Sequence, residues 1–253
     1  MALFISVINH NHDEMISGST TLKNLAQQHT VIIKSNTKAK TSLKEYCKKA
    51  GIYLEQGNSF KGFGANNNEV FNIAKTSFGM REKDYFLVLN PDVEISREAV
   101  SLLLAELEHT PADISAINLF RDKAMTEYDN SIRHYPKLLN PFKTLLGLPR
   151  KDIYNKELIK KPTNIDWAAG SFLLFKALAY EKLNGFDEKY FMYFEDADIC
   201  TRANIKGYKV MYFPKIKAVH FASHQNRKLF SKHFIWYLSS KFRYHFQHNS
   251  TSR

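Results

Sequence analysis

The sequence predicts one α/β domain in which short buried strands alternate with helices. Its 253 residues are enough for a substantial core, and its 44% hydrophobic and 24% charged content are ordinary for a globular protein. Short apolar runs bounded by polar residues predict strands at 3–8, 30–34, 52–55, 84–89, 114–120 and 210–213. Periodic or capped segments predict helices at 41–50, 69–76 and 97–109, and a further helix that ends at Gly207.

Polar side chains follow the first two predicted strands. Asn9 comes directly after the first strand, and Ser35 and Asn36 follow the second. Open α/β sheets bind ligands at the carboxyl ends of parallel strands, so these residues are candidates for a binding site. His10 and His12 lie beside Asn9 at a spacing that also suggests a metal, but on a loop such residues are more often ordinary polar residues.

A Gly-x-Gly sequence, Gly62 to Gly64, leads into the helix expected at 69–76. Such a turn can bring backbone N–H groups against a phosphate or a ribose. The alternative is a tight strand-to-helix connection that binds nothing. The third glycine of a dinucleotide-binding fingerprint is missing, so this is not that motif.

The strand expected at 84–89 ends in Asn90-Pro91-Asp92. A carboxylate held at a strand end by a rigid proline is a good hard-oxygen ligand for Mg²⁺ or Mn²⁺. The same three residues are common in turns, so on their own they leave both interpretations open.

Three carboxylates occur within four residues at Glu195, Asp196 and Asp198, after an aromatic run that begins at Tyr190. Carboxylates this close raise one another's pKa, and apolar neighbours raise it further. A helix start is the simpler interpretation, because acidic residues favour the helix dipole and Asp198 can pair with Arg202. We assign that role to Asp198 and Arg202. The aromatic residues beside Glu195 and Asp196 favour a pocket that holds a base or a metal ligand.

The formal net charge of +11 favours an anionic partner such as nucleic acid, a membrane surface or a phosphorylated substrate. No nucleic-acid recognition motif is present, and a nucleic-acid-binding protein would leave the acidic cluster unexplained. The two cysteines, Cys47 and Cys200, lack zinc spacing. No run approaches the roughly eighteen apolar residues of a membrane span, and the apolar start is too short for a signal peptide. We therefore expect a cytoplasmic protein that binds no nucleic acid.

Between Trp167 and His220 the chain carries several motifs in order, namely Gly170-Ser171-Phe172-Leu173-Leu174, Asn184-Gly185-Phe186-Asp187-Glu188, Phe191-Met192-Tyr193-Phe194-Glu195-Asp196-Ala197-Asp198, Arg202, Gly207-Tyr208 and His220. These motifs resemble those of the inverting, GT-A-fold glycosyltransferases of family 2. The resemblance implies a single-domain nucleotide-sugar transferase with a central mixed, mostly parallel sheet flanked by helices. Within the family, the sequence is similar to rhamnosyltransferases that build bacterial O-antigen on a lipid carrier.

The resemblance implies a role for each candidate residue. Asp196 matches the catalytic base. Asp92 matches the metal-binding carboxylate of an Asp-x-Asp motif whose first Asp is replaced by Asn90, and His220 is a candidate second ligand to Mg²⁺ or Mn²⁺, with a buried polar residue as the alternative. The expected nucleotide-sugar-binding residues are Asn9, Ser35, Asn36, Gly62, Gly64, Asn67 and Asn90, although the family usually has an Asp at the position of Ser35. The expected acceptor-binding residues are Trp167, Gly170, Glu195 and Arg133.

Two segments are expected to meet the acceptor and its membrane. Regular periodicity fades over 121–165, where basic and proline residues gather, so we expect an irregular acceptor-side segment with an apolar surface at 142–148. Arg133 in this segment can meet a phosphate, with a surface ion pair as the alternative. Residues 226–253 lack Asp and Glu and predict a basic, aromatic helix on anionic lipid, with a helix packed on the domain as the alternative. The expected division is a transferase domain at 1–225 and a membrane-surface segment at 226–253.

The function that the resemblance implies is transfer of L-rhamnose from dTDP-L-rhamnose to N-acetylglucosaminyl-diphospho-undecaprenol, in O-antigen and lipopolysaccharide biosynthesis. The expected partners are this nucleotide sugar, polyprenyl-diphosphate-linked N-acetylglucosamine, and the anionic inner face of the bacterial cytoplasmic membrane. One alternative keeps the fold and mechanism but uses another donor, such as UDP-galactofuranose or UDP-N-acetylglucosamine. A second alternative is a non-catalytic nucleotide-sugar-binding assembly partner, because Ser35 and Asn90 replace acidic residues of the family.

Overall fold

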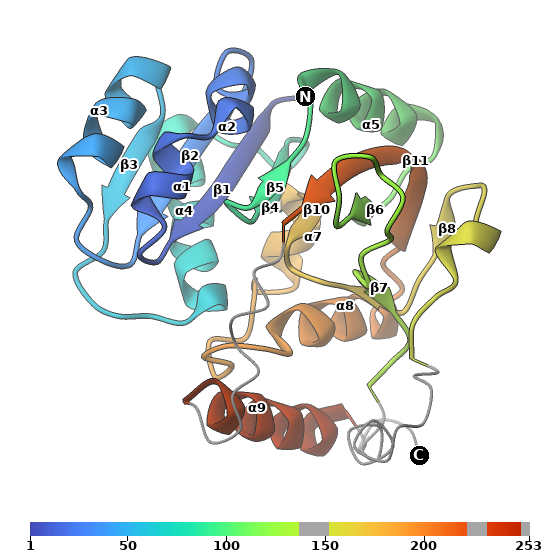
Figure 1. Ribbon diagram of the computed structural model, residues 1–253. Coiled ribbons are helices and arrows are strands. Elements are labelled where there is room, and N and C mark those ends of the chain that lie inside the picture. Colours follow the sequence, from blue (N-terminus) through green and yellow to red (C-terminus); the bar gives the residue numbers. More distant parts are fainter. Residues whose placement is uncertain (137–151, 222–231, 249–253) are drawn as a thin grey trace.

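The protein is described here by a computed structural model that covers residues 1–136, 152–221 and 232–248. Within these residues a central sheet has the strand order β3-β2-β1-β4-β10-β6-β11-β5, and β8 pairs with β11 (Figure 1). The strands are β1 (Leu3–Asn9), β2 (Thr30–Ser35), β3 (Tyr53–Gln56), β4 (Tyr85–Leu89), β5 (Val93–Glu94), β6 (Ile114–Phe120), β8 (Thr163–Asn164), β10 (Phe172–Lys176) and β11 (Val210–His220). A second, two-stranded sheet joins β7 (Ile132–Arg133) to β9 (Trp167–Ala168).

The pairing confirms the expected mixed, mostly parallel sheet. Strands β3, β2, β1 and β4 are parallel to one another, and β6 is parallel to β11. Strand β10 lies between β4 and β6 and is antiparallel to both. The parallel strands on the two sides of β10 therefore point the same way, and their carboxyl ends lie along one edge of the sheet.

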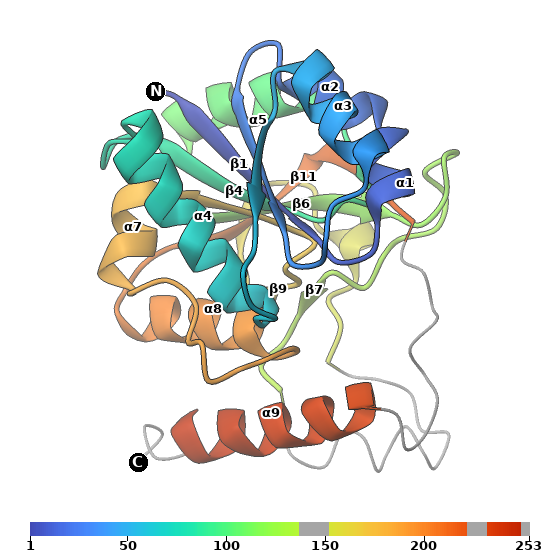
Figure 2. The same ribbon diagram turned by 90° about the vertical axis from the view of Figure 1, so that its left-hand side faces the viewer.

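Helices cover both faces of the sheet because the strands are apolar on both sides. Alternate residues of β1 show this, since Leu3, Ile5 and Val7 enter one buried cluster and Phe4 enters the other. The first cluster is covered by α1 (Asp13–Ser17), α2 (Thr20–Leu25), α3 (Thr41–Ala50) and α5 (Arg97–His109). The second is covered by α4 (Phe63–Phe78), α7 (Ala177–Lys182) and α8 (Glu195–Ile205), and Figure 2 shows the two groups on opposite sides.

The predicted strands and helices are all present with differences at their ends, whereas β10, α1, α2 and α7 were not predicted from the sequence pattern. Helix α4 begins at Phe63, six residues before the predicted start, so Gly64 and Asn67 are helical and do not lie in a loop. Strand β11 continues past Pro214 to His220, because its register against β6 shifts between Phe213 and Lys217. A proline is tolerated at such an irregularity, since no ladder hydrogen bond is required from it.

Helix α9 (Lys232–His248) lies against α8 at one end of the molecule (Figures 1 and 2). The Tyr244 hydroxyl is 2.8 Å from the Thr201 hydroxyl, and the Ser240 hydroxyl donates to the Met192 carbonyl. None of the helices in the described part of the chain is long and apolar enough to cross a membrane. The apolar stretch expected to face lipid at 142–148 lies outside the described residues.

Candidate active site

The candidate residues gather at the carboxyl edge of the parallel strands. Asn9 ends β1 and Ser35 ends β2, and the two face each other in the parallel register. Asn90 directly follows β4, and His220 ends β11. These four positions carry the polar residues that the sequence places after apolar runs, at the edge where open α/β sheets bind ligands.

The first two strand ends are joined by hydrogen bonds. The Asn9 side-chain amide donates to the Ser35 hydroxyl at 2.8 Å, and its oxygen accepts from the His12 backbone N–H. The Asn36 side chain exchanges two hydrogen bonds with the backbone of Lys61, which immediately precedes Gly62. The end of β2 and the start of α4 are therefore held together as one polar corner.

The two glycines at the start of α4 allow close approach. A Cβ on Gly62 would lie 2.3 Å from the Phe191 carbonyl oxygen, and a Cβ on Gly64 would lie 2.7 Å from Cβ of Phe186. The Phe63 backbone N–H donates to the same Phe191 carbonyl. The glycines thus bring α4 against the aromatic run that leads into α8. Asn67, one turn further on, is buried, and its side chain contacts the Ser6 hydroxyl and the Phe63 carbonyl.

Asp196 lies in the first turn of α8 and is held by two backbone donors. The Gly170 N–H donates to Oδ2 at 3.0 Å, and the Ala197 N–H donates to Oδ1 at 2.8 Å. Burial raises the pKa of Asp196 above that of an ordinary aspartate, although these hydrogen bonds and the positive charge of Arg133 act in the opposite direction. The result is an oriented carboxylate with an increased affinity for a proton.

Glu195 is the more deeply buried member of the pair, with 6% of its surface exposed. Its Oε2 atom accepts no hydrogen bond from the described residues. Burial and the neighbouring Asp196 carboxylate raise the pKa of Glu195 well above the ordinary value. Asp198 differs, because it pairs with Arg202 at 2.7 Å and with His248 of α9 at 2.8 Å. The predicted ion pair between Asp198 and Arg202 is confirmed.

The residues before Glu195 have an uncommon backbone conformation. Tyr193 and Phe194 have φ values of 71° and 68°, in the left-handed region that side chains other than glycine rarely adopt. Stacking on α9 holds this conformation, since the Phe194 ring lies 5.5 Å from Tyr237 and the Phe191 ring lies 4.6 Å from Trp236. Consecutive strained residues beside a carboxylate pair are typical of functional sites.

Arg133 and Trp167 face each other across the small second sheet. They are paired in the register of β7 and β9, and the guanidinium of Arg133 lies over the Trp167 ring at 5.4 Å. The indole N–H of Trp167 donates to the His134 carbonyl. Strand β9 ends two residues before Gly170, which bonds to Asp196, and the charge of Arg133 acts on that carboxylate.

Hydrogen bonds along one short segment connect these groups. The Asn90 N–H donates to the Ser171 carbonyl at the start of β10, and the next residue back, Gly170, holds Asp196. A Cβ on Gly170 would lie 3.1 Å from the Phe63 ring of α4. Asn90 and the predicted base thus contact the same turn, while Asn67 is buried in α4.

His220 lies between two carboxylates. Its Nδ1 atom is 2.7 Å from Asp129 Oδ2, and its Nε2 atom is 3.4 Å from Asp92 Oδ1. Burial lowers the pKa of His220, but the two carboxylates outweigh burial and raise the pKa to about 9. The longer contact is an ion pair, so the buried Oδ1 atom of Asp92 has no hydrogen-bond donor among the described residues.

Sequence reasoning missed two polar residues behind this pair, Asp129 and Lys156. Lys156 is buried, and its ammonium donates to the Ser131 hydroxyl and the Leu119 carbonyl. Both residues lie in the irregular segment 121–165, where no periodicity marks a buried position. The sequence signal for these two residues is their charge, because they lie in segment 121–165, which is expected to border the site.

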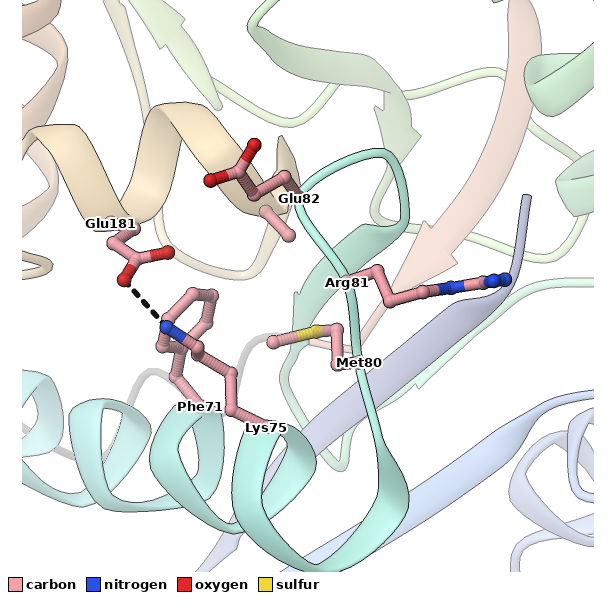
Figure 3. A pocket seen from close by; sticks show the side chains of 7 residues that line it. Phe71, Lys75, Met80, Arg81, Glu82 and Glu181 are labelled. Carbon is pink, nitrogen blue, oxygen red and sulfur yellow. Dashed lines mark hydrogen bonds and ion pairs between the residues drawn. The ribbon is translucent and has the colours of Figure 1, made fainter.

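A pocket of about 290 Å³ lies elsewhere, between α4, α7 and the loop before β4 (Figure 3). Phe71 and Met80 line it, and the Lys75–Glu181 ion pair crosses one wall at 2.5 Å. Because this loop precedes β4, the pocket lies at the amino-terminal edge of the sheet, opposite the candidate site. None of the predicted site residues lines it.

Comparison with known proteins identifies the family. Residues 9–181 match the family described as "Glycosyl transferase family 2". The chain belongs to glycosyl transferase family 2. This glycosyltransferase is 36% identical over 244 residues to "Rhamnosyltransferase WbbL" of Escherichia coli (strain K12), an alignment that covers 96% of this chain and 92% of the relative. It is 30% identical over 148 residues to "N-acetylglucosaminyl-diphospho-decaprenol L-rhamnosyltransferase" of Mycobacterium tuberculosis (strain CDC 1551 / Oshkosh), covering 56% and 48% of the two chains.

Solved structures share the fold at low sequence identity. The crystal structure of GalNAc-T7 with UDP, GalNAc and Mn²⁺ aligns with a TM-score of 0.62 and 14% identity, over 87% of this chain and 43% of that one. The crystal structure of S. aureus TarS 1–349 aligns with a TM-score of 0.58 and 13% identity, over 100% and 74%. The transferase therefore has the expected GT-A fold, and it spans less than half of the GalNAc-T7 chain.

The close contact at the start of α4 makes Gly62→Ala destabilising. The added Cβ meets a backbone oxygen at 2.3 Å, so either α4 or the segment around Phe191 must shift. We expect a loss of about 1–3 kcal/mol in the free energy of unfolding, measured by denaturant titration. The control is Gly18→Ala, where the nearest atom to the new Cβ is 3.5 Å away. Equal stability of the Gly62 variant and the wild type would show that the contact is not tight.

Proposed function

We propose that this glycosyltransferase moves L-rhamnose from dTDP-L-rhamnose to N-acetylglucosamine carried on undecaprenyl diphosphate, in the assembly of an O-antigen or related lipopolysaccharide. The observation that carries the reaction is the oriented, partly buried carboxylate of Asp196 beside the strand ends. The sugar and acceptor class rest on the similarity along most of the chain to a protein named as a rhamnosyltransferase, and on the acceptor in the name of the mycobacterial relative.

The reaction needs a base, because a sugar hydroxyl is a poor nucleophile. In the proposed step Asp196 accepts the proton of the acceptor hydroxyl while the hydroxyl oxygen attacks the anomeric carbon of the donor. The bond from that carbon to the nucleotide diphosphate breaks on the opposite face, so the configuration inverts. The raised pKa of Asp196 supports this role, since a carboxylate with greater proton affinity is a stronger base.

The residues near His220 fit a divalent cation. The Asp92 Oδ1 atom is buried without a hydrogen-bond donor, and carboxylate oxygen with imidazole nitrogen suits Mg²⁺ or Mn²⁺. Two adjacent ligands of an octahedral ion at 2.1 Å lie about 3.0 Å apart, close to the observed 3.4 Å between Oδ1 and His220 Nε2. No group of three acidic, histidine or cysteine side chains in the described ranges could hold a metal ion, so the donor diphosphate is proposed to complete the coordination. When bound, the ion neutralises the charge of the leaving diphosphate.

The donor is proposed to lie over the polar corner formed by the ends of β1 and β2 and the start of α4. Asn9, Ser35 and Asn36 face the nucleoside in this proposal, and Asn90 lies nearer the diphosphate. The helix start at Gly62 and Gly64 favours a negative group nearby, because unpaired N–H groups point outward there. Asn67 supports this site from behind, through its buried contacts with Ser6 and Phe63.

The acceptor is proposed to enter on the other side of Asp196. Trp167 offers an apolar surface to a sugar ring, and Gly170 allows the sugar to approach the backbone. Arg133 is proposed to meet the diphosphate of the lipid carrier, because its charge already acts on Asp196. Glu195 borders the same pocket and favours its protonated form, in which it can donate a hydrogen bond to an acceptor oxygen.

Helix α9 is proposed to rest on an anionic membrane surface, with the enzyme on the cytoplasmic face. Its outer side exposes Ile235, Phe242 and Phe246, at 63%, 53% and 81% of their surface. These residues follow helical spacing, and Arg243 lies exposed beside them. An apolar stripe next to a cation is typical of a helix in the lipid headgroup region. The inner side of the same helix holds the residues before Asp196, so the site would lie close to the lipid.

The first test combines the donor, the acceptor and the base. The protein is incubated with Mg²⁺ or Mn²⁺, a short-chain N-acetylglucosaminyl-diphospho-lipid and a panel of nucleotide sugars, and released nucleotide diphosphate is measured. We expect a product with dTDP-L-rhamnose alone, and we expect Asp196→Asn to bind donor but lose about 10²–10⁴-fold in kcat. A product with another donor would contradict the assignment of L-rhamnose as the transferred sugar. Near-normal turnover of the Asn variant would contradict the assignment of Asp196 as the base. Bound nucleotide without turnover on any acceptor would favour the non-catalytic alternative.

The pH dependence of kcat/KM tests Asp196 in a second way. The base must be ionised, so its raised pKa places the acid limb above the pH at which an ordinary aspartate titrates, about 3.9. Arg133→Met removes a charge that lowers this pKa, and we expect the acid limb to move to higher pH. Arg133→Lys keeps the charge and should leave the limb near its wild-type position. A Met variant whose limb stays in place or moves to lower pH would contradict the assignment.

Membrane contact is tested with vesicles of defined composition. We expect binding to vesicles that contain phosphatidylglycerol, weaker binding to phosphatidylcholine alone, and weaker binding at high salt. Replacing both Phe242 and Phe246 with Ser should weaken binding by about tenfold or more, because both rings are exposed in the free protein. The control is Leu102→Ser on α5, where the side chain is 53% exposed. Equal binding of the double variant and the control would contradict the proposed membrane contact of α9.

A further inference from the structure

Asp129 makes the shorter of the two contacts with His220. The distance from Asp129 Oδ2 to Nδ1 is 2.7 Å, against 3.4 Å from Nε2 to Asp92. Both side chains are largely buried, with 14% of Asp129 and 12% of His220 exposed. An ionised carboxylate only accepts hydrogen bonds, so Nδ1 must be the donor in this pair.

The backbone places Asp129 at this position. Chain segments on both sides of a turn after β6 pair with each other, through a bridge between Phe120 and Tyr128 whose rings lie 5.0 Å apart. The Asp129 N–H donates to the Leu119 carbonyl at 2.9 Å. In the parallel ladder of β6 and β11, Phe120 is the partner of Val219, the residue before His220. The turn therefore brings Asp129 beside the end of β11.

A buried lysine fastens the same turn. Lys156 Nζ lies 3.2 Å from the Leu119 carbonyl and 2.9 Å from the Ser131 hydroxyl, so it bridges the two chain segments on either side of Asp129. A buried lysine and a backbone pairing therefore hold the Asp129 carboxylate in position. Arg121, whose Nε atom is 3.8 Å from Asp129 Oδ1, is a longer and more exposed contact than His220.

We propose that Asp129 is a positioning residue that fixes the ring of His220 and presents its Nε2 lone pair to the divalent ion. This inference rests on the proposed metal site at Asp92 and His220. A histidine that binds metal through one nitrogen commonly donates its other N–H to a carboxylate, which sets the tautomer and the ring orientation. Here the nitrogen that faces Asp129 is Nδ1, and the nitrogen that faces Asp92 is Nε2.

The experiment measures Mn²⁺ binding in the presence of dTDP, by electron paramagnetic resonance of free Mn²⁺, without any sugar transfer. We expect Asp129→Ala to weaken Mn²⁺ binding about 10–100-fold. Asp129→Asn keeps the shape of the side chain and an acceptor oxygen, and should give a smaller loss. The matched control is Asp122→Asn in the same turn, where the side chain bonds to Thr126 and to the backbone of Glu127.

A double-mutant cycle separates positioning from a general effect on the fold. In a His220→Ala background, Asp129→Ala should cause no further loss of Mn²⁺ affinity, because Asp129 acts through the ring that has been removed. An equal loss in both backgrounds would overturn the proposal, and so would a folded Ala variant with wild-type affinity. If the Ala variant does not fold, the Asn variant carries the same comparison.

The outcomes for the wild type separate this inference from the proposed function. If the wild type binds Mn²⁺ only when dTDP is present and the Asp129 variants bind it equally well, the positioning role of Asp129 is rejected. The proposed metal site is then retained. Wild-type protein that binds no Mn²⁺ under these conditions would overturn the metal site and the role of Asp129 together. Neither outcome requires sugar transfer or the acceptor.

Discussion

The hydrogen bond from the Gly170 N–H to Asp196 Oδ2 is the contact on which the site depends. Gly170 lies two residues before β10, the antiparallel strand between β4 and β6. Because β10 runs against its neighbours, its amino-terminal end lies at the carboxyl edge of the parallel strands. The turn that holds Asp196 is therefore fixed by the strand order of the sheet. Glycine lets this turn approach α4 closely, since a Cβ there would lie 3.1 Å from the Phe63 ring.

Two adjacent carboxylates, one buried and one partly buried, are tolerated because their surroundings differ. Asp196 receives backbone hydrogen bonds and the field of Arg133, while Glu195 has an oxygen without a donor among the described residues. Both pKa values are raised, and the partner's charge is a larger contribution for Glu195. This asymmetry favours a proton on Glu195 over one on Asp196, and an ionised Asp196 is the state that a base requires.

The alternating strands and helices and the strand-end residues follow from local pattern, whereas the GT-A arrangement follows from the family resemblance and β10 has no counterpart in the predicted strands. Apolar runs followed by Asn9, Ser35 and Asn90 are visible without any knowledge of contacts. The start of α4 was placed six residues late, because Gly62 and Gly64 are unfavourable in helices and only their contacts with Phe191 and Phe186 explain them. Asp129 could not be predicted, since its role arises from a turn that pairs residues 120 and 128 and from contact with His220, which lies 91 residues later in the chain.

Charge is divided along the chain in a way that separates two functions. All 25 Asp and Glu residues lie at or before Asp198, together with as many Lys and Arg residues, so the whole net charge of +11 arises from residues 199–253. The part of the chain that forms the polar corner of Asn9, Ser35 and Gly62 is thus neutral overall and brings no net positive charge to an anionic donor. In the proposed chemistry the diphosphate is therefore neutralised by local groups, which is the role proposed for a cation at Asp92 and His220. The excess positive charge begins at Arg202 in α8 and continues to the end of the chain, and three of these cations, Lys232, Lys241 and Arg243, belong to α9, the helix proposed to meet anionic lipid.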